Sequence, residues 1–176
     1  MKLTKKLLAM ALAGVMLLTI LTGCSGGKTG DRLVEEYIAA YYHSFPAYKD
    51  KPITHDVPEI KTVAENFDPS WLNADDSWNI QGGNNSTDVR YKALKDVFNK
   101  YADGYYTVDL YAFKVDSKQS ELNQTMLVWA PGGNHGLSIY SPFGSVTAIQ
   151  CATRLVTRGN QSYRIIVIIC DHHPLG

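Results

Sequence analysis

Two cysteines late in the chain, Cys151 and Cys170, flank a Gly159-Asn160 turn between two apolar segments. If these two turn residues form the whole loop of a hairpin, Cys151 faces Ile168, and Cys170 lies diagonally across on the same face. A four-residue loop over 159–162 instead places the cysteines directly opposite each other, at a separation that suits a disulfide. The sequence therefore allows a disulfide, but it favours two reduced thiols in an apolar core.

A second group of reactive side chains, Asp171-His172-His173, follows directly after Cys170. Neighbouring side chains on an extended segment point in opposite directions, so the two histidines cannot easily share one ion. No third ligand follows at a metal-binding spacing, and we interpret the segment as a solvated tail. We therefore predict neither a metal site nor a cofactor.

The long segment 70–86 and a later glycine-rich turn carry further polar groups. The oxygen atoms of Asn73, Asp75, Asp76 and Ser77 are of a kind that binds calcium, but the glycine and distal glutamate of an EF-hand loop are missing. A solvated acidic loop is the preferred interpretation.

His135 follows Pro131-Gly132-Gly133-Asn134, and a glycine-rich loop with a histidine can lie over a ligand. A hairpin needs glycine and asparagine for positive φ in any case, so we interpret this segment as a turn.

Aromatic residues form the last candidate group. Trp71 and Trp78, with Tyr105 and Tyr106, form either an aromatic binding surface or part of the core, and the sequence does not separate these cases. The phosphate loop, the Gly-x-Ser-x-Gly elbow, His-Glu-x-x-His and Cys-x-x-Cys are all absent from the sequence. No motif identifies a reaction, and the prediction leans away from an enzyme.

The first residues predict export from the cytoplasm. Lys2, Lys5 and Lys6 precede an apolar run over residues 7–21, which matches the charged and hydrophobic regions of a secretory signal. The run has fifteen residues, whereas a helix needs roughly 20 to cross a bilayer. Leu21-Thr22-Gly23-Cys24 follows directly, with small residues where a signal peptide is cleaved.

This sequence resembles the lipobox of bacterial lipoproteins. The resemblance implies cleavage after residue 23, a diacylglyceryl group on the Cys24 sulfur and often a third acyl chain on the new amino terminus. Two or more acyl chains make a stable membrane anchor, whereas one is marginal. Residues 24–30 then form a flexible tether. We expect an extracytoplasmic protein anchored to the cell membrane, or to the outer membrane if the envelope has one.

Composition places the rest of the chain, residues 31–176, in one globular domain. The full sequence holds 17 basic and 17 acidic residues, and three of the lysines belong to the predicted signal. The mature protein is therefore slightly acidic. It has no basic stripe, so we predict no nucleic-acid partner.

Three helices are predicted, followed by strands. Apolar residues recur at helical spacing over 31–43, 56–67 and 87–102, and Asp56 with Glu59 has the form of a capping box. Strands are predicted from β-branched and aromatic content and from turn residues. Their ranges are 106–116, 125–130, 136–141, 146–157 and 163–170.

This order predicts an α+β fold with the helices on one face of a curved antiparallel sheet of four or five strands. The run at 165–169 is apolar on both faces, which indicates a central strand. The order of elements over 31–170 resembles the NTF2-like (cystatin-like) superfamily, a bent sheet wrapped as a cone around its helices.

Three functions are compatible with that resemblance. A non-catalytic binding domain would hold an envelope ligand or protein in the mouth of the cone, lined by aromatics such as Tyr37, Tyr41, Trp71 and Trp78. An NTF2-like isomerase, dehydratase or hydrolase would place an acid–base pair inside the cone, for which the candidates are His43 and Asp109. An assembly module of a secretion or conjugation apparatus is the third.

Overall fold

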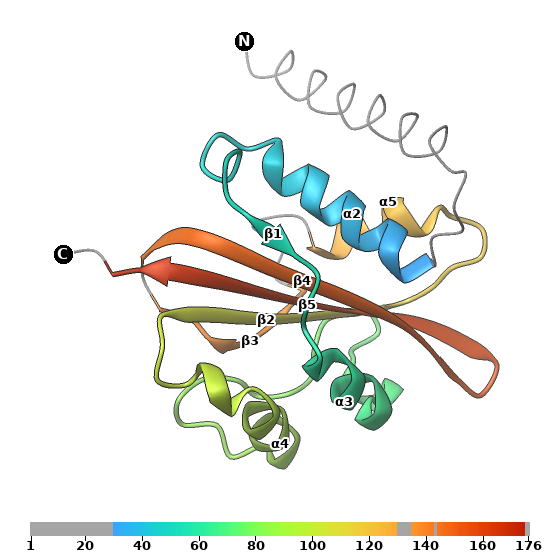
Figure 1. The fold of residues 1–176 in the computed structure, drawn as a ribbon. Coiled ribbons are helices and arrows are strands. Elements are labelled where there is room, and N and C mark those ends of the chain that lie inside the picture. The colour runs from blue at the N-terminus through green and yellow to red at the C-terminus, as the bar shows by residue number, and fades with distance from the viewer. Residues whose placement is uncertain (1–29, 130–134, 143, 175–176) are drawn as a thin grey trace, which may run out of the picture.

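Figure 1 shows the fold in a computed structural model, which describes residues 30–129, 135–142 and 144–174. The predicted α+β class is confirmed: in these residues four helices pack against a five-stranded mixed sheet. The helices are α2 (Gly30–His43), α3 (Glu59–Asn66), α4 (Val89–Val97) and α5 (Glu121–Trp129). The strands are β1 (Ile53–Thr54), β2 (Tyr106–Lys114), β3 (Leu137–Tyr140), β4 (Ser145–Arg158) and β5 (Gln161–His173).

The sheet has the order β1-β4-β5-β2-β3. β4 and β5 form a long hairpin around Gly159-Asn160, with Gly159 at a φ of 59° that glycine adopts without strain. β5 pairs with β4 on one side and β2 on the other, so the predicted central strand is confirmed. The short β1 runs parallel to β4, which makes the sheet mixed rather than wholly antiparallel.

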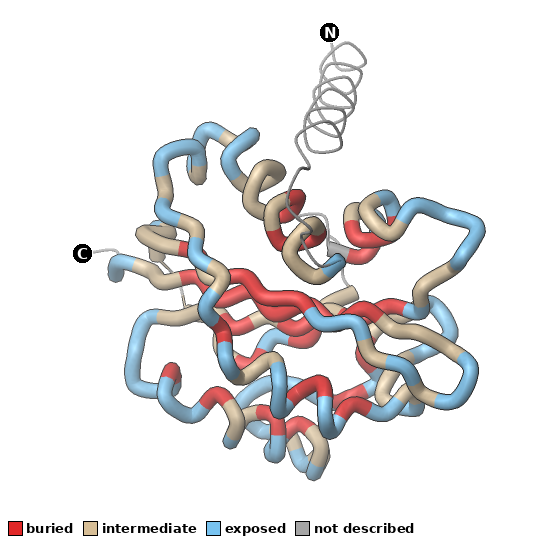
Figure 2. The backbone as a smooth tube through the Cα atoms, turned by 45° about the vertical axis from the view of Figure 1, so that its right-hand side comes forward, coloured by how far each residue is buried: buried red, intermediate tan, exposed pale blue. Residues whose placement is uncertain are grey.

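Helices cover both faces of the sheet, so the expected single helical layer is wrong. α2 and α5 lie over one face, and α3 and α4 lie over the other (Figures 1 and 2). β5 explains the difference, because Ile165 to Ile169 are all buried and alternate between the two faces. A strand that is apolar on both sides requires a cover on both sides.

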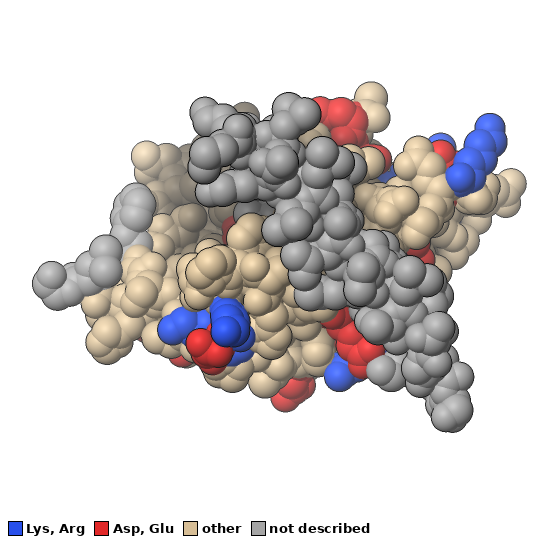
Figure 3. Space-filling model, turned by 90° about the horizontal axis from the view of Figure 1, so that it is seen from above, with Lys and Arg blue, Asp and Glu red and all other residues tan. Residues whose placement is uncertain are grey.

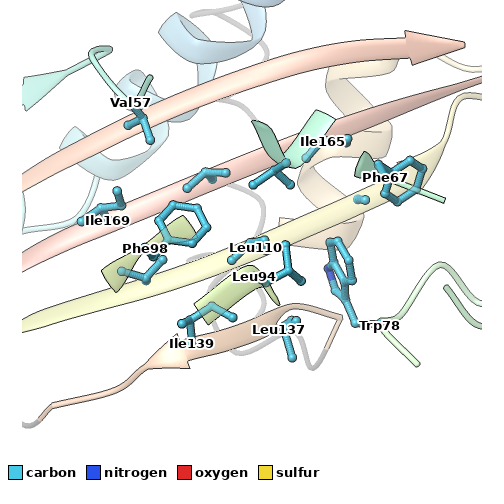
Figure 4. Packing of buried hydrophobic residues seen from close by; sticks show 14 of the residues in the cluster. Val57, Phe67, Trp78, Leu94, Phe98, Leu110, Leu137, Ile139, Ile165 and Ile169 are labelled. Carbon is cyan, nitrogen blue, oxygen red and sulfur yellow. The ribbon is translucent and has the colours of Figure 1, made fainter. Parts of the chain in front are cut away.

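Each face has its own apolar cluster. On the α3/α4 face, Phe98, Leu110 and Ile165 are among the buried residues of the larger cluster (Figure 4). On the α2/α5 face, Ile38 of α2, Phe113 of β2 and Ile168 of β5 belong to a smaller one. Burial of these side chains is the main force that holds the helices to the sheet.

The strand predicted at 125–130 is wrong, because the chain forms α5 there. The buried residues Gln124, Thr125 and Val128 lie one and four positions apart, which is a helical rather than an alternating spacing. Gln124 also fixes the start of this helix, since its amide accepts from the Asp116 N–H at 2.8 Å and donates to the Asp116 carbonyl at 2.9 Å. A short apolar run does not separate helix from strand by itself.

Two further boundaries differ from the prediction. The second helix begins at Glu59, after Pro58, and no side chain caps it, so the capping box at Asp56 is not formed. The segment Asp171-His172-His173 is part of β5 up to its last residue and is not a solvated tail.

Among the described residues no helix combines the length and apolar character needed to cross a bilayer. The predicted signal and Cys24 lie outside the described residues.

Candidate functional site

A groove runs along β3, the edge strand of the sheet. We call it the β3 groove, and it has a volume of about 730 Å³. β3 and the residues after it form one wall, and the loop after Trp78 and the turn before β2 form the other. The lining residues are Trp78, Ile80, Gly82, Gly83, Asn84, Ala102, Gly104, Tyr106 and 136–142.

The second wall is well ordered because aromatic contacts hold it. Trp78 packs against Trp71 and Phe67, with ring centroids 6.3 and 6.2 Å apart. The Asn79 N–H also donates to the Trp71 carbonyl at 2.7 Å. Gly82 lies so close to Leu137 that an added Cβ would sit 3.2 Å from the leucine Cδ1. The segment predicted as an irregular loop is therefore pinned against β3.

Two polar atoms in the groove walls have no hydrogen-bond partner in the described part of the chain. They are the Trp78 indole Nε1 and the Tyr140 hydroxyl, and both atoms are buried. Burial also raises the pKa of Tyr140, helped by nearby Tyr91. A buried polar atom that lacks a partner costs free energy, so both atoms are unfavourable features of these walls.

β3 has one free edge at this groove, because among the described strands it pairs only with β2. One of its carbonyls, that of Ile139, accepts a hydrogen bond from the Tyr91 hydroxyl of α4 at 3.1 Å. Lys95, also of α4, lies over the Tyr140 ring at 5.6 Å. A free edge presents backbone donors and acceptors to any extended chain that lies beside it.

The aromatic residues assigned to one ligand pocket lie on opposite faces of the sheet. Tyr37 and Tyr41 belong to α2, on the α2/α5 face. Trp71 and Trp78 belong to the other cluster or pack against it. The sheet separates the two pairs, so the expected shared pocket is not formed. Of the four, Trp78 lines the β3 groove.

The loop aspartates and His135, predicted as separate features, line one pocket of about 660 Å³. Asp76 has a φ of 63°, which is unusual for a residue other than glycine, and it accepts from the Lys114 N–H at 3.3 Å. Burial raises the pKa of Asp76, whereas hydrogen bonds from Ser77 lower that of Asp75. The described residues contain no group of three His, Cys, Asp or Glu side chains placed to hold a metal ion. The turn 131–134 lies outside the described residues.

His43 and Asp109 do not form the acid–base pair that the resemblance implied. The His43 Nε2 contacts the Lys51 carbonyl at 2.9 Å on the exposed end of α2. Asp109 instead accepts a hydrogen bond of 2.5 Å from the Ser138 hydroxyl of β3. Burial raises the pKa of Asp109, while the Ser138 hydrogen bond and the charge of His172 oppose the rise.

His172 is held on both sides in the sheet. Its Nε2 lies 2.7 Å from the Thr107 hydroxyl, and its Nδ1 lies 3.1 Å from the Gly144 carbonyl. The carbonyl can only accept, so Nδ1 carries a proton, and in the neutral ring Nε2 accepts from Thr107. His173 is exposed at the end of β5, so the two histidines do not converge.

Cys151 and Cys170 are buried free thiols in the structure. Cys151 faces Ile168 and Cys170 faces Ile149, which is the diagonal arrangement expected for the two-residue turn. Burial raises the pKa of the Cys170 thiol to about 12 and that of Cys151 well above its usual value. Neither thiol is therefore a nucleophile at neutral pH.

One acid and one histidine do lie close together, in a pocket of about 380 Å³ beside β4. They are Glu35 and His55, with 3.7 Å between the carboxylate Oε2 and the ring Nδ1. The other oxygen of Glu35 accepts from the Thr153 N–H at 3.1 Å. The separation exceeds a hydrogen bond and Glu35 is already used to join α2 to β4, so the pair serves the fold.

Comparison with known proteins adds no further guide. No family model matches the sequence, and neither a curated protein nor a solved structure matches it. Sequence reasoning missed the wall formed by Ser138, Tyr140 and Gly82-Gly83. The paired glycines after two tryptophans were the available signal, since such a pair lets a backbone approach another segment closely.

Proposed function

We propose that this chain is a lipid-anchored envelope protein whose folded domain binds an extended polypeptide segment in the β3 groove, without catalysis. The observation that carries the proposal is a groove that follows the edge of β3 left unpaired by the described strands. An added strand would form backbone hydrogen bonds with β3, and its alternate side chains would face the apolar wall near Trp78.

The enzyme and assembly alternatives have weaker support. Among the described residues no histidine is hydrogen-bonded to an acid in a pocket, as an acid–base site would require. The large apolar side chains that are exposed come from separate parts of the fold, whereas a docking module would gather them into a patch. They are Val89, Tyr105, Leu127 and Leu155.

A peptide library tests the binding proposal. Full-length protein in detergent is screened against random peptides of about ten residues, and bound peptides are titrated by tryptophan fluorescence. Ser141 is exposed and lines the groove, so Ser141→Trp should block binding and lower affinity about tenfold or more. Ser117→Trp, at an exposed serine outside the groove, is the matched control.

The mode of binding has its own readout. Methylating one backbone nitrogen of the bound peptide at a time should weaken binding at every second position, because only alternate N–H groups of an edge strand face its partner. If the peptides bind Ser141→Trp as tightly as the wild type, or if the methylation series shows no alternation, strand addition at β3 is rejected. Binding of an oligosaccharide but of no peptide would also reject it.

The anchor is tested separately. Mass spectrometry of the protein extracted from membranes should show a chain that begins at a diacylated Cys24. An unmodified cysteine, or a chain that retains residues 1–23, would contradict the anchor and leave the groove proposal standing.

A further inference from the structure

Asp109 is a carboxylate near the start of β2, on a face where the later residues of the strand are aromatic. It projects to the α2/α5 face with Tyr111 and Phe113, and its neighbour across the β5 ladder is Ile168. Its one hydrogen bond among the described residues comes from Ser138. No lysine or arginine in the described part of the chain forms an ion pair with it.

His172 does not supply the missing partner. The charge of His172 lowers the pKa of Asp109, but the two ring nitrogens of His172 contact Thr107 and Gly144 instead. A desolvated carboxylate without a cation is unfavourable, and natural proteins keep such a group mostly where it has a task. The absent component is therefore a positive charge beside Asp109.

Two tyrosines complete the surroundings of the carboxylate. Tyr111 lies two residues after Asp109 on the same face of β2, and Tyr42 of α2, like Tyr111, packs against the cluster on this face. Burial raises the pKa of both tyrosines, and the negative charge of Asp109 adds to each rise. The Tyr111 ring lies flat against Gly136, where an added Cβ would sit 2.5 Å from the ring Cε1. Aromatic rings around a carboxylate are a suitable environment for an organic cation.

We propose that Asp109, Tyr42 and Tyr111 form a binding site for an organic ammonium group on the α2/α5 face, distinct from the β3 groove. Figure 3 looks onto this face, which is hollowed on its left side. A metal ion fits less well, because the described side chains offer no group of three ligands. The carboxylate pairs with the ammonium charge, and the rings contact its methyl or methylene groups.

Choline chloride is the probe, and its neutral carbon analogue 3,3-dimethylbutanol is the comparison. Binding to the full-length protein is followed by ligand-observed NMR. Choline should bind about tenfold or more tightly than the alcohol, because its charge pairs with the carboxylate and the alcohol has no charge. Equal binding of the two compounds would overturn the proposal.

Variants locate the site. Asp109→Asn should weaken choline about tenfold or more, whereas Asp50→Asn, at an exposed loop acid, should leave affinity unchanged. Tyr111→Leu should lower the affinity for choline about two- to fivefold. Tyr111→Phe should lower it little, since phenylalanine keeps the ring face. Circular dichroism of each variant confirms folding. Unchanged choline binding in folded Asp109→Asn would reject the site.

The pH profile gives an independent readout, because the charge of choline does not titrate. Affinity should rise with pH as Asp109 ionises, and this rise should vanish in Asp109→Asn. The other titratable groups around Asp109 are Tyr42 of α2, Tyr111 of β2, and Cys170 and His172 of β5. A rise that persists in Asp109→Asn belongs to His172 and contradicts the assignment.

Discussion

The two faces of the sheet share the strand β5 but are held to their helices in different ways. The α3/α4 face is an apolar and aromatic core that contains Phe67, Trp78 and Phe98. The α2/α5 face has a smaller apolar cluster, and charged side chains lie at both of its ends. Arg164 lies at one end and Asp109 at the other, on the same side of the sheet.

Arg164 shows how the second face differs. Its side chain is 1% exposed and joins two helices to β5, since it pairs with Asp31 of α2 and with Glu121 of α5. A buried guanidinium costs desolvation, and well-placed partners offset that cost. The α3/α4 face is therefore held by packing and by hydrogen bonds, such as those from Arg158 to the Ala64 and Phe67 carbonyls, whereas the α2/α5 face also depends on buried ion pairs. Substitutions on the two faces should accordingly differ in the size and the location of their effects.

Phe98→Ala should be the most destabilising of these substitutions. Phe98 is fully buried on the α3/α4 face, and truncation leaves a cavity in a core without polar groups to compensate. We expect a loss of about 3–5 kcal/mol in the free energy of unfolding, measured by urea denaturation. Val89→Ala, at a side chain that is 76% exposed in the same helical region, should change it by less than about 0.5 kcal/mol.

Arg164→Ala should cost about 2–4 kcal/mol, somewhat less than Phe98→Ala, because Asp31 and Glu121 are part-exposed and can be rehydrated. Hydrogen exchange should accelerate mainly in α2 and α5. Arg32→Ala, which removes part-exposed pairs with Glu35 and Glu36 within α2, is the control. If α3 and α4 lose protection to the same extent, the two faces do not differ as described.

Asp109→Asn should stabilise the apo protein at neutral pH. The folded-state pKa of Asp109 is raised above its unfolded value, so folding binds a proton between the two pKa values, and stability falls as pH rises through that range. The asparagine removes this loss while its carbonyl still accepts from Ser138. The gain should vanish at pH values below the ordinary pKa of aspartate. A variant that is equally or less stable than the wild type at pH 7 would refute the assignment.

The smallest expected effect concerns the cysteines, whose thiols should be almost unreactive toward an alkylating reagent in the native protein. Burial keeps both thiols protonated by raising the pKa of each, so iodoacetamide at pH 8 should modify Cys151 and Cys170 many times faster in urea than in buffer. Intact mass under non-reducing conditions should show two free thiols. A mass lower by two hydrogens would establish the disulfide that the sequence leaves open.

Local patterns in the sequence were enough for much of the fold. The apolar stripe of α2 and the Gly159-Asn160 turn predicted a helix and a hairpin, because these follow from neighbours in the chain, whereas the register of the hairpin stayed open between two loop lengths. Residues 125–130 were mistaken for a strand, since a short apolar run fits both periods and the hydrogen bonds of Gln124 to Asp116 decide between them. The candidate sites were harder to predict from the sequence. His43 and Asp109 were paired by analogy with a family, and the structure places them apart.

By itself, the sequence determined the class of the fold and the central position of β5, because each depends on spacing along one or two segments, and it narrowed the cysteines to a diagonal or a directly opposite placement. The tertiary structure alone decided which groups meet. Ser138 reaches Asp109 across 29 positions, and Arg164 meets Asp31 across 133. Contacts at such separations depend on how helices are shared between two faces, and no local periodicity encodes that choice.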